Sequence, residues 1–192
     1  MTCSGAKKFD VGFVLDVSGS IGSRDWDVEK TFTKKLARVI DISPAGGRAG
    51  VVIFNHYAYL QIKFNQYTTY SGFAGGVDRL PYYSGGTSIS RGLRLALDQL
   101  FTSRNGMRSD AVGEVVLITD GQDSGSDYNQ IAANYRARNI KIIIIGVGYV
   151  NKVNLRKLVS SDKDLYIAKD FNALKFDSFA ENVGETICNG II

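Results

Sequence analysis

The stretch FDVGFVLDVSGS, residues 9–20, decides the fold of this chain. Its apolar part has the composition of a buried parallel strand, and the strand ends at Asp16, where such a strand opens into a loop. Ser18 and Ser20 follow at alternate positions. Aspartate and serine are also favoured at turns and helix caps, so these residues alone fit a cap as well as a binding site. Only further ligand residues elsewhere in the chain would favour a binding site over a helix cap.

Length and composition indicate one globular domain. The chain has 192 residues, 44% of them hydrophobic, which is enough for a sizeable core. We expect a single domain over residues 1–192, with its core at about residues 9–188. The net charge is only +4 and the basic residues are scattered, which argues against nucleic-acid binding. No run approaches the roughly 18 consecutive apolar residues of a membrane span, so we expect no membrane insertion.

Strand and helix patterns alternate along the rest of the chain. Buried strands are predicted at residues 48–55, 112–119, 140–147 and 165–168. The alternation over residues 56–64 predicts an edge strand antiparallel to the strand before it. Helical spacing is found at about residues 25–40, 70–80, 89–100, 127–138, 153–159 and 176–187, with charged residues between the apolar ones. This order predicts a doubly wound α/β domain.

Two further loops offer oxygen ligands. The loop Gly85-Gly86-Thr87 presents Thr87 at the start of a predicted helix, although Thr87 or Ser88 would equally serve as the cap of that helix. The strand at residues 112–119 ends at Asp120, as the first strand ends at Asp16. Ligands of open α/β sheets bind outside the carboxyl ends of the strands, where the winding reverses. If the two strands are neighbours there, their loops bring hard oxygen ligands together, which suits Mg²⁺ and not zinc or copper.

The two cysteines, Cys3 and Cys188, lie at opposite ends of the sequence. This placement favours a disulfide, which would put the protein in an oxidising compartment. Two buried free thiols in a cytosolic protein are the alternative. The first residues lack the features of a signal peptide, so we expect a fragment of a larger secreted protein.

Three separated motifs resemble a von Willebrand factor type A domain with an intact metal-ion-dependent adhesion site. They are Asp16-Val-Ser18-Gly-Ser20, Gly85-Gly86-Thr87 and Thr119-Asp120-Gly121, and the resemblance covers residues 9–188. It implies a mostly parallel six-stranded sheet with one antiparallel edge strand and helices on both faces. It also implies Mg²⁺ or Mn²⁺, with Ca²⁺ as a further candidate, bound directly by three hydroxyls and directly or through water by two carboxylates. The implied ligands are Ser18, Ser20, Thr87, Asp16 and Asp120.

The resemblance also implies a function. The terminal cysteines are similar to those of extracellular-matrix members of the family, so the chain is expected to be a secreted, non-catalytic adhesion module. Its metal would bind an acidic residue of a matrix protein, with collagen as a candidate. The alternative is a structural or tension-bearing spacer that self-associates and whose metal only stabilises the loops. An Mg²⁺-dependent phosphohydrolase is disfavoured, because the three motifs contain no histidine, lysine or arginine for catalysis.

Four tyrosines form a candidate surface for a partner: Tyr57, Tyr59, Tyr82 and Tyr83. The alternative is that these side chains only cover the edge of the sheet and the helix ends. After Gly148 the chain leaves no room for the extra short helix of collagen-binding integrin domains, which argues against recognition of collagen in the integrin manner.

Overall fold

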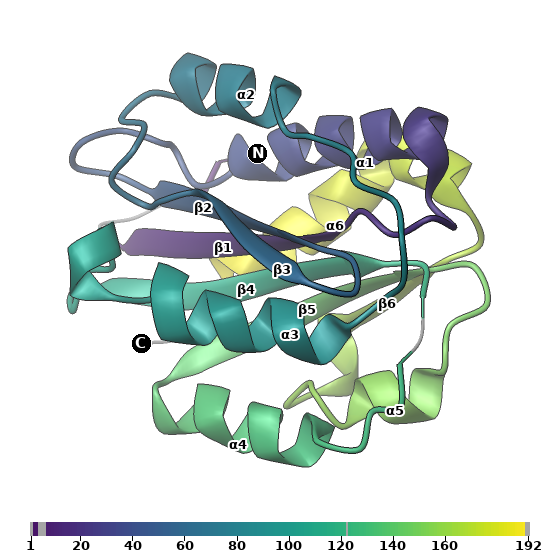
Figure 1. The fold of residues 1–192 in the computed structure, drawn as a ribbon. Coiled ribbons are helices and arrows are strands. Elements are labelled where there is room, and N and C mark those ends of the chain that lie inside the picture. The colour runs from purple at the N-terminus through teal and green to yellow at the C-terminus, as the bar shows by residue number, and fades with distance from the viewer. Residues whose placement is uncertain (1, 4–6, 122, 191–192) are drawn as a thin grey trace.

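The computed structural model describes residues 2–3, 7–121 and 123–190, so residues 1 and 192, the predicted limits of the domain, lie outside it. Its centre is a six-stranded sheet with the order β3-β2-β1-β4-β5-β6 (Figure 1). The strands are β1 (Lys8–Asp16), β2 (Arg48–Phe54), β3 (Ala58–Ile62), β4 (Ala111–Thr119), β5 (Ile140–Val147) and β6 (Leu165–Ala168). Only β2 and β3 pair antiparallel. The predicted sheet, including its antiparallel edge strand, is confirmed.

Helices cover both faces of the sheet, as Figure 1 shows. The helices α1 (Gly22–Ala37), α2 (Tyr70–Asp78) and α6 (Asp177–Cys188) lie on one face, and α3 (Ile89–Leu95), α4 (Tyr128–Ala137) and α5 (Lys152–Arg156) lie on the other. Shorter helical turns are η1 (Ala96–Leu100), η2 (Ser103–Asn105), η3 (Asp162–Asp164) and η4 (Phe171–Lys175). No described helix has the length and hydrophobicity needed to cross a membrane.

The central strand β1 is apolar or small over its middle part, from Val11 to Leu15. Phe13 packs in the core on the α1 side, with its ring centroid 6.2 Å from that of Phe73 in α2. The next residue, Val14, packs on the opposite side in the same cluster as Leu93 of α3. Successive residues of a strand point to opposite faces and both faces are covered here, which explains why the residues between Asp10 and Asp16 are all apolar or small.

Helix α1 differs from its predicted form at the start and in its buried face. It begins at Gly22, and the N-cap residue makes no side-chain hydrogen bond, so Asp25 lies within the first turn. The buried face contains Trp26, Glu29 and Phe32. Glu29, which the sequence pattern places among the charged residues between the apolar ones, therefore points into the core.

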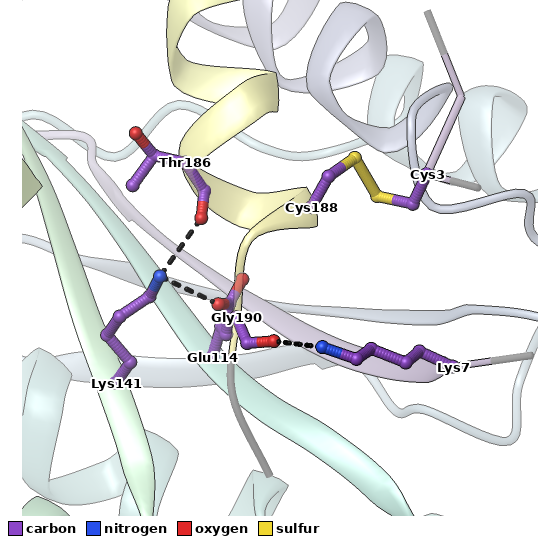
Figure 2. The surroundings of a disulfide bond; sticks show 7 residues. All are labelled: Cys3, Lys7, Glu114, Lys141, Thr186, Cys188 and Gly190. Atoms are coloured by element: carbon purple, nitrogen blue, oxygen red, sulfur yellow. Dashed lines mark hydrogen bonds and ion pairs between the residues drawn. A yellow bond between two sulfur atoms is a disulfide. The ribbon is translucent and has the colours of Figure 1, made fainter. Parts of the chain in front are cut away.

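The end of α6 is fastened to the rest of the domain beside the start of the sheet. A disulfide joins Cys3 to Cys188, with the two Cα atoms 4.9 Å apart, so the predicted disulfide is present and the free thiols are not (Figure 2). Lys7 Nζ donates a hydrogen bond to the carbonyl oxygen of Gly190 (3.0 Å), and Lys141 Nζ donates one to that of Thr186 (3.0 Å). These contacts and the disulfide hold the last turn of α6 at this end of the molecule.

Candidate metal centre

The strand order places the ends of β1 and β4 side by side. From β1 the chain continues to β2 on one side, and β4 lies on the other side, so the winding reverses between β1 and β4. Leu15 is paired with Ile118, and Asp16 therefore lies at the same edge of the sheet as Asp120. Asp16 is fully buried, and Asp120 is half-buried. This edge is the position at which doubly wound domains bind ligands.

Hydrogen bonds connect four of the five predicted ligand residues. Asp16 Oδ1 accepts a hydrogen bond from the backbone N–H of Ser18 (2.8 Å). Ser20 Oγ donates to Asp120 Oδ1 (2.8 Å) and lies 3.3 Å from Ser18 Oγ. Thr119 was not predicted as a site residue, but its hydroxyl donates to Asp16 Oδ2 (2.7 Å). Each of the two carboxylates thus accepts a hydrogen bond from one of the serines that follow β1.

Thr87 comes from the third loop and lies against the other two. The cap of α3 is Ser88, whose side chain accepts from the N–H of Arg91 (3.4 Å), so Thr87 does not cap this helix. A Cβ atom placed on Gly121 would lie 3.0 Å from Thr87 Oγ1, which shows how closely these loops approach. The N–H of Gly19 also donates to the carbonyl oxygen of Gly85 (2.8 Å). We refer to Asp16, Ser18, Ser20, Thr87 and Asp120 as the candidate metal centre.

Tyr82 braces the loop that carries the two serines. Its hydroxyl donates to the carbonyl oxygen of Ser18 (2.8 Å) and accepts from the N–H of Gly22 (3.0 Å). Asn55 holds the neighbouring loop in a similar way, because its Nδ2 donates to the carbonyl oxygen of Ser84 (2.7 Å). The loops around the centre are therefore fixed by the fold itself.

The other three predicted partner-binding tyrosines lie together at the β2–β3 hairpin. Tyr57 is 59% exposed and Tyr83 is 48% exposed. The ring centroids of Tyr59 and Tyr83 are 5.0 Å apart, and the guanidinium of Arg91 lies 5.4 Å from the ring centroid of Tyr57. These exposed rings border the loop of Thr87, whereas Tyr82 is directed to the serine loop.

Burial raises the pKa values of the two aspartates of the centre. It raises the pKa of Asp16 to about 6, despite the hydrogen bonds from Ser18 and Thr119. Burial also raises the pKa of Asp120, and the charge of Asp25 acts in the same direction. Among the residues that the structure describes, no lysine, arginine or histidine forms an ion pair with either carboxylate.

Glu29 adds a third buried carboxyl group near the centre, and sequence reasoning missed it. Its side chain is inaccessible to solvent, and neither carboxylate oxygen has a hydrogen-bond partner among the described residues. Burial, and then the charges of Asp16 and Asp120, raise its pKa well above the ordinary value. The signal in the sequence was its spacing, three residues after Trp26 and three before Phe32, which puts it on the apolar face of α1.

Two other buried carboxylates, Asp10 and Glu114, have cationic side chains beside them. Arg108 Nη2 lies 2.6 Å from Asp10 Oδ1, and Lys141 Nζ lies 3.1 Å from Glu114 Oε1. The edge with Asp16, Asp120 and Glu29 is different, because its negative charge is not neutralised by any ion pair of the described chain. This contrast fits a bound cation.

Two more acidic residues near Asp120 belong to a separate network. Asp123 accepts hydrogen bonds from the N–H of Ser90 (3.2 Å) and from the hydroxyl of Tyr128. Asp127 accepts from Ser90 Oγ (2.6 Å) and pairs with Arg94. Both carboxylates thus attach the loop after β4 to α3 and are satisfied there.

The fold and the position of this centre define a doubly wound α/β domain with a polar site at the reversal of the winding. The von Willebrand factor type A domain family matches residues 10–181. The chain belongs to this family.

The relatives are matrix proteins. The chain is 29% identical to the mouse (Mus musculus) protein "Collagen alpha-4(VI) chain" over 97% of its length, and 23% identical to human (Homo sapiens) "Matrilin-3" over 95% of its length. It spans only 8% and 38% of these two proteins. The relatives are secreted proteins of the extracellular matrix, in agreement with the predicted localisation.

Solved structures agree with the fold. A crystal structure of proximal thread matrix protein 1 from the mussel byssus superposes with a TM-score of 0.90 at 23% identity, over 97% of this chain and 49% of that one. A second structure of that protein, with zinc in its MIDAS motif, has a TM-score of 0.86 at 27% identity over 97% of this chain and 47% of that one.

Proposed function

We propose that this domain is a non-catalytic adhesion module of the extracellular matrix, which binds an acidic residue of a partner protein through a divalent cation. The observation that carries the proposal is the meeting of three loops at the edge of the sheet, where two carboxylates and hydroxyls touch without a cationic side chain. A site of this composition suits Mg²⁺ or Mn²⁺, which prefer hard oxygen ligands. Zinc in the MIDAS motif of the mussel protein supports a cation at the same place.

In this proposal Asp16, Ser18, Ser20, Thr87 and Asp120 hold the cation. Among the described residues no three acidic, histidine or cysteine side chains are arranged to hold a metal, so the hydroxyl oxygens are essential members of the set. When bound, the cation supplies a positive charge that a partner carboxylate can coordinate. The hydrogen bonds of Tyr82 and Asn55 keep the loops in place. The exposed rings of Tyr57 and Tyr83 would be contacts for the partner.

The metal-dependence of binding tests this proposal. We expect the affinity of the domain for surface-immobilised fibrillar collagen or matrix extract, measured with Mg²⁺, to fall by more than roughly tenfold in EDTA or on Asp120→Ala, since even residues that only orient metal ligands contribute that much. Asp110→Ala is the matched control, because Asp110 is an exposed carboxylate at the start of β4, paired with Lys8. Affinity that resists both chelation and Asp120→Ala would exclude a metal bridge.

A structural role is the second candidate function, and the disulfide favours it. The disulfide holds the Cα atoms of Cys3 and Cys188 4.9 Å apart. A pulling force applied at these two residues would therefore be carried by the disulfide and would not stretch the sheet. The domain would then serve as a tension-bearing or self-associating spacer. In that case Mg²⁺ raises the melting temperature, but no acidic partner shows metal-dependent affinity.

A further inference from the structure

Asn55 is a buried polar residue directly after β2, and it is not one of the five residues of the candidate metal centre. Only 8% of its surface is exposed. The last residue of β2, Phe54, is paired with Asp16, the last residue of β1. Asn55 therefore lies at the same edge of the sheet as the candidate metal centre, on the side of β1 away from β4.

The side-chain amide of Asn55 makes two hydrogen bonds of opposite kind. Its Nδ2 donates to the carbonyl oxygen of Ser84 (2.7 Å), and its Oδ1 accepts from the N–H of Tyr57 (2.8 Å). The backbone adds a third bond, because the carbonyl oxygen of Asn55 accepts from the N–H of Ser88 (2.7 Å). An amide donates and accepts at once, whereas an alanine side chain does neither. Asn55 thus holds both ends of the loop that carries Thr87.

The loop that carries Thr87 has a backbone conformation that needs such support. Ser84 has a φ angle of 59° and Gly85 one of 96°, so two successive residues are in the left-handed region. Glycine adopts this conformation readily, but a residue with a side chain keeps it only where its surroundings hold it. On the other side of the loop, the N–H of Gly19 donates to the carbonyl oxygen of Gly85 (2.8 Å). The loop is therefore fixed between Asn55 and the loop of the two serines.

We propose that Asn55 is a positioning residue of the metal centre, whose side-chain amide holds the loop in the conformation that presents the hydroxyl of Thr87 to the cation. The inference rests on the proposed cation site, in which Thr87 is a ligand. Asn55 does not contact the cation and acts only through the loop. Because the same amide also binds Tyr57, it connects the cation site to the hairpin that carries the exposed tyrosine rings.

Titration with Mn²⁺ alone, followed by water-proton relaxation, tests the proposal. We expect Asn55→Ala to weaken Mn²⁺ binding by roughly tenfold or more, as for other residues that orient metal ligands. Asn55→Ser should weaken it as much, because a serine hydroxyl still accepts from the N–H of Tyr57 but is too short to reach Ser84. Asn105→Ala is the matched control and should leave the affinity unchanged. Asn105 Nδ2 also donates to a backbone carbonyl oxygen, that of Gln99 (2.7 Å), but at the end of the domain where β2 begins.

A double-mutant cycle separates positioning from a general loss of structure. If Asn55 acts through Thr87, Asn55→Ala should change the Mn²⁺ affinity of a Thr87→Ala domain by less than about twofold, since the ligand that it holds is already absent. Independent, additive factors would contradict a role through Thr87. Amide hydrogen exchange without metal gives a second readout. The N–H groups of Gly19 and Ser88, which bond to the two sides of this arrangement, should exchange faster in Asn55→Ala but not in Asn105→Ala.

The outcomes distinguish this inference from the proposed function. Wild-type Mn²⁺ affinity in both Asn55→Ala and Asn55→Ser would overturn the role of Asn55 and leave the cation site intact. Weaker binding in Asn55→Ala alone would assign the effect to the bond with Tyr57 and would also overturn the inference. A wild-type domain that does not bind Mn²⁺ would overturn both. Each variant should be folded under the conditions of the titration, as measured by urea denaturation.

Discussion

Replacing both cysteines, as in Cys3→Ser/Cys188→Ser, is expected to lower the free energy of unfolding by up to about 5 kcal/mol. The disulfide joins residues separated by 185 positions, so it closes nearly the whole chain into a loop and restricts the unfolded state strongly. Urea denaturation of the variant and the oxidised wild type measures the difference. The slope of the transition should also increase, because a chain without the cross-link exposes more surface when it unfolds.

Lys7→Ala provides the matched control for the disulfide. It removes the hydrogen bond from Lys7 to the carbonyl oxygen of Gly190, which fastens the same end of the chain, and should cost about 1 kcal/mol. The metal centre lies at the far end of β1 from Cys3, so Mn²⁺ affinity should not change in either variant. A loss of stability from the double cysteine variant no larger than that of Lys7→Ala would contradict the prediction.

Local patterns were sufficient to predict the fold and most of the candidate centre. A buried parallel strand is mostly apolar on both faces, so a carboxylate at its end stands out from the pattern. Asp16 and Asp120 could therefore be predicted as site residues from the sequence. The two glycines before Thr87 similarly indicated a closely approaching loop. The antiparallel strand β3 followed from the alternation of its residues.

The residues that escaped prediction act over long sequence separations. Tyr82 was predicted as a contact for a partner, and this stays a prediction. The hydrogen bonds of its hydroxyl to Ser18 and Gly22, about 60 residues earlier, were not predicted, because no local pattern encodes them. Glu29 was overlooked for another reason. A glutamate within an amphipathic helix normally faces solvent, so the spacing that puts Glu29 on the same face as Trp26 and Phe32 did not lead to its prediction as a buried residue.

Buried carboxyl groups lie toward both ends of the sheet, but their surroundings differ. At the carboxyl ends of β1 and β4, Asp16 and Asp120 lack a cationic side chain among the described residues, which suits a site that takes its cation from solution. At the opposite end, Glu114 is paired with Lys141, and Gly190 passes so close that a Cβ atom there would lie 2.4 Å from Glu114 Oε1 (Figure 2). The chain end thus covers a carboxyl group that water does not reach.

This covered carboxyl group should make stability depend on pH. Burial raises the pKa of Glu114 from its ordinary value of 4.5 to about 8, even though Lys141 lowers it. The folded state therefore retains a proton that the unfolded state loses, so its stabilising effect is complete below about pH 4.5 and is lost as the pH rises to about 8. We expect the free energy of unfolding to fall over this range by at most about 1.4 kcal/mol per pH unit.

Glu114→Gln isolates this contribution, because the amide stays neutral at every pH. Urea denaturation between pH 5 and 8 should show the variant gaining stability relative to the wild type as the pH rises, by several kcal/mol in total. Glu185→Gln, an exposed change on α6, should leave the profile of the wild type unaltered. The other carboxyl groups with raised pKa values are the same in both proteins, so their effects cancel in the comparison. Parallel pH profiles of the wild type and Glu114→Gln would show that Lys141 keeps Glu114 ionised and that the buried pair is an ordinary ion pair.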